Sequence, residues 1–195
     1  MQKITQLVEE IRKLIRHPSK KRSLLQHNVA WNMLYSCLDV IEDTECCLDA
    51  FLATDLDHFD GRDQHLADGN KYMYVYGALQ ALYLQQDAIT HLTESLCLVK
   101  SFKLPCSLAK IREIRNASIG HPTKQDRPSK KPVRFNFISR ISIGNQGFKL
   151  GTTYDDGSPD CFKDVNMPKL IATQKRIFIG VLENVIKTLQ KEGVS

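Results

Sequence analysis

Apolar residues recur at helical spacing along most of the chain, and a pair of neighbouring strands before the last helix interrupts that pattern. The first helix carries apolar residues from Ile4 to Ile15 and ends before Pro18, a residue that a helix interior does not accept. The pattern predicts helices over residues 1–16, through 34–52, over about 71–102, from about 107 to before 120, and from about 166 to 193.

Between Val133 and Tyr154 the spacing changes to the two-residue alternation of β-strands. Two alternating runs flank the turn-forming sequence of residues 144–147, and together they predict a β-hairpin over residues 133–156. In the first run the apolar residues Phe135, Phe137, Ile141 and Ile143 alternate with polar residues. We therefore expect a mainly all-α protein, an up-and-down helical bundle with an inserted β-hairpin before the last helix, forming a single domain over residues 1–195.

The composition is that of an ordinary globular protein, with 195 residues, 42% hydrophobic and 25% charged. No apolar run approaches the roughly 20 residues of a membrane helix, so we expect a soluble protein without a membrane partner. The first helix contains Glu9 and Glu10 and has no continuous apolar segment, which argues against a signal peptide and favours the cytoplasm. The six cysteines form no C-x-x-C motif and are expected to be reduced thiols, mostly small core residues.

Charge is unevenly distributed along the chain. Residues 39–68 hold ten acidic residues and one basic residue, whereas residues 100–140 hold eleven basic residues and two acidic ones. A polyanion should prefer the second stretch. Two alternatives remain open, a solvated basic loop and a basic loop that docks on the protein's own acidic segment.

Two polar features interrupt the helical pattern. Gln86 lies in the middle of the apolar face of the third helix, so either a polar group from a neighbouring helix or backbone groups must hydrogen-bond to it. The acidic segment of residues 55–70 fails as a calcium loop, because Phe59, Asp60 and Leu66 occupy positions that need a ligand, a glycine and a glutamate. We expect a surface loop there and no metal site.

The most informative local sequence is Ile-Arg-Asn-Ala-Ser-Ile-Gly-His-Pro, residues 114–122, at the end of the short helix. It contains Arg115, then Asn116, and then His121 after five intervening residues. This sequence resembles the motif of the HEPN family (higher eukaryotes and prokaryotes nucleotide-binding), an arginine followed after four to six residues by a histidine, often with a polar residue directly after the arginine. The surrounding helical bundle is also similar to that family, over roughly residues 24–123 and the last helix.

The resemblance implies a metal-independent endoribonuclease of the kind found in toxin-antitoxin and phage-defence systems, acting as a homodimer without a cofactor. Attack by the RNA's own 2′-hydroxyl needs a group that titrates near neutrality, and His121 would take that role. Arg115 would stabilise charge on the phosphoryl oxygens through a planar, permanently charged guanidinium. Asn116 would orient the histidine or the phosphate.

Further residues are assigned supporting roles on the same basis. Gln86 and Asp87 would form a supporting layer behind the catalytic residues. The RNA backbone would follow the basic residues Lys124, Arg127, Lys130 and Lys131. The expected partners are RNA, a second copy of the chain and an antitoxin protein. Members paired with nucleotidyltransferase antitoxins carry a tyrosine two residues after the histidine, where this chain has Thr123, so modification of such a tyrosine is not expected here.

Three other interpretations stay open. Many HEPN proteins have lost catalysis, so the chain could be a non-catalytic module that binds RNA, a nucleotide or a protein. Arg115 and Asn116 could merely cap the helix terminus while His121 lies on a surface loop. A purely structural scaffold would place Arg115 in a buried salt bridge with the acidic stretch.

Overall fold

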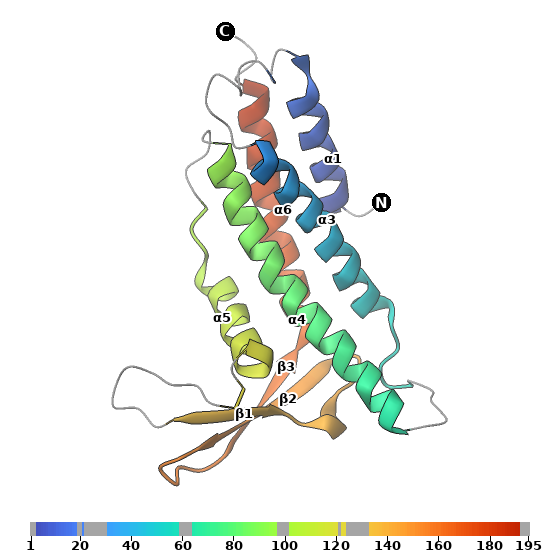
Figure 1. Ribbon diagram of the computed structural model, residues 1–195, viewed down its shortest axis with the longest axis vertical. Helices are drawn as coiled ribbons and strands as arrows, with labels where there is room; N and C mark the ends of the chain where they lie inside the picture. Colours follow the sequence, from blue (N-terminus) through green and yellow to red (C-terminus); the bar gives the residue numbers. More distant parts are fainter. Residues whose placement is uncertain are drawn as a thin grey trace.

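The protein is a helical bundle with a small antiparallel sheet across one end, as Figure 1 shows for the computed structural model. The structure describes residues 3–18, 21, 31–58, 64–96, 102–120, 122–123 and 133–191. Its long helices are α1 (Lys3–Arg16), α3 (Trp31–Ala53), α4 (Gln64–Ser95) and α6 (Met167–Lys191). The prediction of a mainly helical protein is confirmed.

The core lies between the long helices. The most extensive helix contacts join α3 with α4 and α1 with α6. One continuous cluster includes Ile11 from α1, Leu38 from α3, Leu82 from α4 and Phe178 from α6, all fully buried. Each helix thus forms because its apolar stripe has a matching stripe to cover it.

Acidic residues of the stretch 39–68 hold helices together. Arg12 of α1 forms ion pairs with Asp39 and Glu42 on α3. Lys175 of α6 lies 2.8 Å from a carboxylate oxygen of Glu45 and 2.8 Å from one of Asp49, both also on α3. These acidic side chains therefore face basic residues of α1 and α6. The basic loop of residues 124–132 lies outside the described residues, so its proposed docking on this segment stays untested.

The predicted hairpin is part of a three-stranded sheet. Strands β1 (Arg134–Ile138) and β2 (Gly147–Tyr154) pair antiparallel, with Phe137 opposite Gly151. A third strand, β3 (Cys161–Asn166), pairs with the other edge of β2 and leads directly into α6. The sequence pattern did not predict β3, because its residues are exposed except for Val165 and show no apolar alternation.

In strand β1 the face that carries the two phenylalanines points away from the bundle, although an apolar face is normally the buried one. Phe135 and Phe137 are exposed, whereas Asn136 and Ile138 are buried against the bundle. The strand also ends before Ile141, which lies in a 3-10 turn (Arg140–Ser142) and is 98% exposed. Alternation indicates that two faces differ, but packing decides which face is covered.

Helix α4 begins earlier than predicted, so residues 64–70 are helical and do not belong to a loop. The Gln64 side chain donates to Asp68 one turn later at 2.8 Å, and Ala67 is buried between them. A helix turn of this kind needs only one apolar residue and local polar pairs, so hydrophobic periodicity does not reveal it. The helix also ends earlier, at Ser95, and Phe102 lies outside it.

Some of the predicted stripes are shifted by one position. Leu52 is 46% exposed and Phe51 is buried in its place, while Tyr76 on α4 is also exposed. On α6 the apolar residues Leu170, Ile177 and Val181 are only partly buried, whereas Phe178, Leu182, Val185 and Leu189 are fully buried. Such shifts reflect neighbours on either side of a helix, which a single stripe does not encode.

Polar contacts fix the sheet to the bundle. The Tyr72 hydroxyl of α4 donates to the backbone carbonyl of Ile138 at 3.2 Å. The side chain of Asn145, in the turn before β2, accepts from the backbone of Leu56 at 2.6 Å and donates to Asp55 at 2.9 Å. The sheet is therefore anchored to the end of α3 and the start of α4.

Candidate functional site

The residues of the HEPN-like motif lie where a short helix gives way to a wide turn. Helix α5 (Cys106–Arg115) buries Leu108, Ile111 and Ile114 against the bundle. The chain then continues as a π-helical turn, η1 (Asn116–Gly120), whose hydrogen bonds span five residues. Single π-turns are often found at functional sites, and this one begins directly after Arg115.

The guanidinium of Arg115 is held from several sides. Its Nε and Nη2 donate to the side-chain oxygen of Gln80 on α4, at 3.1 and 2.7 Å, and its Nη1 donates to the side-chain oxygen of Asn116 at 3.0 Å. The group also lies over the ring of Tyr83, 4.5 Å from the centroid. Asn116 therefore orients the arginine directly, whereas its expected role of orienting the histidine or the phosphate stays a prediction.

Arg112 shares this arrangement one turn earlier. Its guanidinium lies 4.4 Å from the centroid of the same Tyr83 ring, its Nε donates to Gln86 at 2.7 Å, and it forms an ion pair with Asp87. Gln86 and Asp87 were expected to form a supporting layer behind the catalytic residues. The structure shows both in contact with Arg112, and their support of the proposed catalytic residues stays a prediction. Gln86 and Asp87 face α5 one turn closer to its start, so they hold Arg112.

The buried amide of Gln86 belongs to a chain of polar side chains through the core. Gln86 donates to Gln174 of α6 at 2.8 Å, Gln174 donates to Gln85 at 2.9 Å, and Gln85 donates to Glu45 of α3 at 3.3 Å. All four of these side chains belong to nearly or fully buried residues. Both alternatives for Gln86 are therefore met, since neighbouring helices supply polar side chains and the amide also donates to the backbone carbonyl of Leu108 at 3.5 Å.

The two neighbours of His121 in the sequence are both fixed by contacts. Gly120 packs against the guanidinium of Arg115 so closely that a Cβ there would lie 2.8 Å from Nη1. Pro122 accepts a 2.7 Å hydrogen bond at its carbonyl from the backbone N–H of Asn136 in β1. The turn and the sheet thus hold the segment before and after residue 121.

Several predicted residues lie outside the part of the chain that the structure describes. These are His121 and the basic residues Lys124, Arg127, Lys130 and Lys131. The structure brings Arg115 and Asn116 together, whereas the roles of those other residues stay predictions.

Three residues of the site were missed in the sequence. Gln80 and Tyr83 lie three apart on α4, the same spacing as Arg112 and Arg115 on α5. This shared spacing is compatible with the observed contacts, but it does not specify which residues of α4 face Arg112 and Arg115. Gly120 carried a signal, since a glycine beside an expected catalytic histidine indicates close packing.

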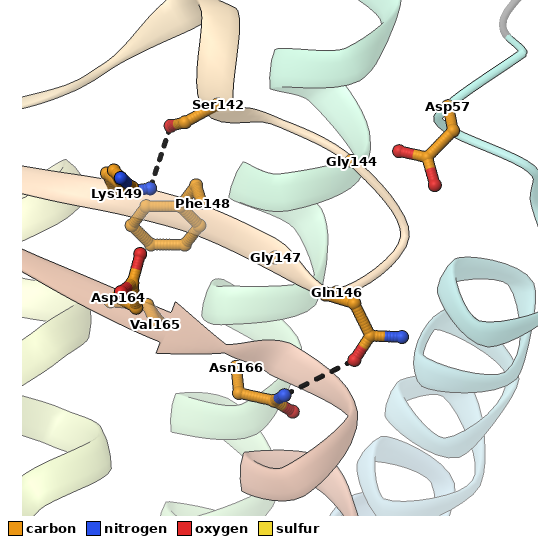
Figure 2. A pocket seen from close by; sticks show the side chains of 10 residues that line it. All are labelled: Asp57, Ser142, Gly144, Gln146, Gly147, Phe148, Lys149, Asp164, Val165 and Asn166. Carbon is orange, nitrogen blue, oxygen red and sulfur yellow. Dashed lines mark hydrogen bonds between the residues drawn. The ribbon is translucent and has the colours of Figure 1, made fainter.

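Figure 2 shows a separate cavity at the edge of the sheet, beside the turn of residues 144–147. Its two carboxylates, Asp57 and Asp164, lie on opposite sides of the cavity and do not converge. Asp57 instead accepts from the backbone of Asn145 at 3.1 Å. Across the described ranges no group of three or more His, Cys, Asp or Glu side chains could hold a metal ion. We therefore attribute this cavity to the way the turn of residues 144–147 packs beside Asp57, and assign it no ligand.

No family model matches this sequence, and no curated protein or solved structure matches it either. None of the helices within the described ranges combines the length and apolar character needed to cross a membrane.

Proposed function

We propose that the protein is a metal-independent endoribonuclease of the HEPN type, in which Arg115 binds the scissile phosphate and His121 transfers a proton. The observation that supports it most is the restraint on the Arg115 guanidinium by Gln80, Asn116 and Tyr83 at the start of a wide turn. A catalytic arginine needs such restraint, because transition-state stabilisation depends on a charge that is already oriented.

Arg115 retains the capacity to bind an anion. A guanidinium has five N–H donors, and three hydrogen bonds to amide oxygens leave one N–H on each terminal nitrogen. Among the described residues no carboxylate forms an ion pair with Arg115, in contrast to Arg112, which pairs with Asp87. Two remaining N–H groups on a cation without a carboxylate partner can donate to the oxygens of a phosphodiester. The scaffold interpretation required a salt bridge at Arg115, and the amide contacts argue against it.

His121 is the group in the motif that would move a proton at neutral pH. Consecutive Cα atoms are about 3.8 Å apart, and Gly120 already touches the Arg115 guanidinium. The histidine therefore comes directly after a residue that contacts the phosphate-binding group. As general base it would take the proton of the 2′-hydroxyl, whose oxygen attacks phosphorus while the bond to the 5′-oxygen breaks. The departing 5′-oxygen would then take that proton from the histidinium, giving a 2′,3′-cyclic phosphate and a 5′-hydroxyl.

The same proposal includes the partners implied by the resemblance. The first two are RNA and a second copy of the chain, whose motif faces the same cleft. The third is an antitoxin protein, which would silence this chain in its role as a toxin or phage-defence effector. Sedimentation of the purified chain measures the dimer. The basic residues after His121 would track the RNA backbone, so binding should weaken steeply with salt.

The experiment is cleavage of a mixed-sequence RNA by the wild type and by His121→Ala, Arg115→Ala and Arg115→Lys variants. We expect both alanine variants to lose cleavage and the lysine variant to keep little, because a point charge does not replace the planar fork. Arg140→Ala and His91→Ala are the matched controls, since both residues are exposed and lie outside the site. If all of these variants cleave like the wild type, the proposal is wrong.

A further inference from the structure

A second cavity, of about 310 Å³, lies between α5 and the sheet. Helix α5 and its π-turn contribute Lys110, Glu113, Ile114 and Ala117, and the inner face of the sheet contributes Arg134, Asn136, Leu150 and Lys163. Arg112 and Arg115, by contrast, contact α4. The cavity is therefore separate from the Arg115 site, and its own chemistry does not depend on the proposed ribonuclease function.

Positive charge dominates this cavity. It is lined by three basic side chains, Lys110, Arg134 and Lys163, and by one acidic side chain, Glu113. Within the described ranges none of these four forms an ion pair. Like charges gathered around a recess repel one another, and a bound anion relieves that repulsion.

A hydrogen-bond donor without a partner lies in the same wall. Asn136 is 8% exposed, and its Nδ2 is buried with no hydrogen-bond partner in the described part of the chain. The hydroxyl of Thr152 donates to the Oδ1 of Asn136 at 2.9 Å, which assigns the other end of the amide as the donor. A buried donor without an acceptor costs free energy, so this N–H calls for an acceptor such as an oxyanion.

We infer that this cavity binds a phosphate group, with Lys110, Arg134 and Lys163 supplying charge and the Asn136 amide supplying a directed hydrogen bond. The phosphate could be a free ion or a phosphodiester of an RNA strand, and both present the same oxygens. Because the backbone of Asn136 also holds Pro122, the bound anion would sit beside the segment that carries His121.

The test monitors the backbone amide resonances of the full-length His121→Ala chain during titration, so that RNA is not cut. One arm uses inorganic phosphate and the other a uridine oligonucleotide without terminal phosphates, both at constant ionic strength with chloride as reference. Two variants probe the cavity, Lys163→Gln and Asn136→Asp. The aspartate keeps an oxygen for Thr152 but replaces the N–H donor with a negative oxygen.

The matched control is Lys149→Gln. Lys149 lies on β2 opposite Asp164, one position from Leu150, which pairs with Lys163, so it projects from the outer face of the same sheet. The control removes the same charge from the same sheet without altering the cavity. Thermal unfolding of each variant checks that it folds, and the exposed Lys163 keeps the test usable if Asn136→Asp is unstable.

We expect saturable shifts at the amides of Ala117, Asn136 and Leu150. The affinity should fall about tenfold in Lys163→Gln and at least as much in Asn136→Asp, and should stay within about twofold in Lys149→Gln. Binding of one probe alone supports the inference and identifies the source of the phosphate. The absence of saturable shifts with both probes, or equal weakening in Lys149→Gln and Lys163→Gln, would overturn it.

Discussion

Gly120 lies against the guanidinium of Arg115, and a Cβ at this position would stand 2.8 Å from Nη1 and 3.3 Å from the side-chain oxygen of Asn116. The π-turn of residues 116–120 brings the chain back to the arginine that precedes it. The close packing of the turn therefore helps to fix the position of the Arg115 guanidinium.

Gly120→Ala should separate folding from activity. Gly120 does not have a positive φ, so its backbone accepts alanine, and the added methyl group meets mainly the flexible end of Arg115. The guanidinium must move, and a displacement of about 1 Å can cost about 10²-fold in rate. We expect a large loss of RNA cleavage with little change in thermal unfolding.

The control for that substitution is Gly180→Ala, where a new Cβ meets nothing within 4 Å. It should leave cleavage unchanged and stabilise α6 slightly, because alanine is the better helix former. Full activity in Gly120→Ala would show that the position of the Arg115 guanidinium does not matter for cleavage.

Gln174→Leu should destabilise the bundle core. The substitution removes the acceptor of the Gln86 amide and the donor to Gln85, leaving two fully buried groups without these partners. Each such group costs about 1–3 kcal/mol, so the free energy of unfolding should fall by about 2–6 kcal/mol. Urea unfolding measures this loss. A variant as stable as the wild type would mean that the amide chain contributes little.

Lys175 should make stability depend on alkaline pH. Burial alone would lower the pKa of Lys175, but hydrogen bonds and charges from Asp49 and Glu45 outweigh it and raise the pKa above its ordinary value of 10.5. The stabilisation is fully present below the pKa of the unfolded chain and is lost as pH rises through the higher pKa of the folded protein.

Urea unfolding measured at a series of pH values from about 8 to about 11 checks this dependence. In Lys175→Met the contribution of Lys175 to the alkaline loss should disappear. At neutral pH the variant should be less stable by about 3 kcal/mol, because the carboxylate of Glu45, whose side chain is 2% exposed, loses its cation. Wild-type stability in this variant would show that the pair is not needed.

Cys37 should be the slowest of the described thiols to react. Burial, and to a smaller degree the charge of Glu94, raises the pKa of Cys37 to about 11, so little thiolate is present at neutral pH. Cys46, Cys106 and Cys161 are exposed. Iodoacetamide labelling followed by peptide mass spectrometry should modify the exposed cysteines first. Early modification of Cys37 would mean that the bundle opens readily around α3.

The sequence predicted the helical bundle and the position of Arg115, because amphipathic periodicity and a residue motif are both local properties. It did not predict that Phe135 and Phe137 face outward, where Phe137 covers Gly151 and contacts Phe162 in an edge-to-face pair. Strand β3 was missed because five of its six residues are exposed and show no apolar alternation, although its partner β2 is the strand directly before it.

The candidate site shows the same division. The Arg115–Asn116 pair and a helix leading into it could be predicted from the sequence, but α5 ends at Arg115 and a π-turn follows where the helix was expected to continue to before Gly120. The contacts of Gln80 and Tyr83 with Arg115 depend on how α4 and α5 lie beside one another, and the stripe of α4 alone does not specify that register. Gln86 was recognised as needing a polar partner, but its actual partners, Arg112 and Gln174, come from two other helices.

We propose that Arg115 and His121 cleave RNA without a metal ion, and the chemistry of the product ends is the sharpest test of this. RNA is incubated in EDTA with the wild type and with His121→Ala, and the new 3′ and 5′ ends are identified by mass spectrometry. We expect 2′,3′-cyclic phosphate and 5′-hydroxyl ends that form with the wild type and are absent with the variant. Failure of the wild type to cleave in EDTA, or 3′-hydroxyl ends among its products, would contradict it.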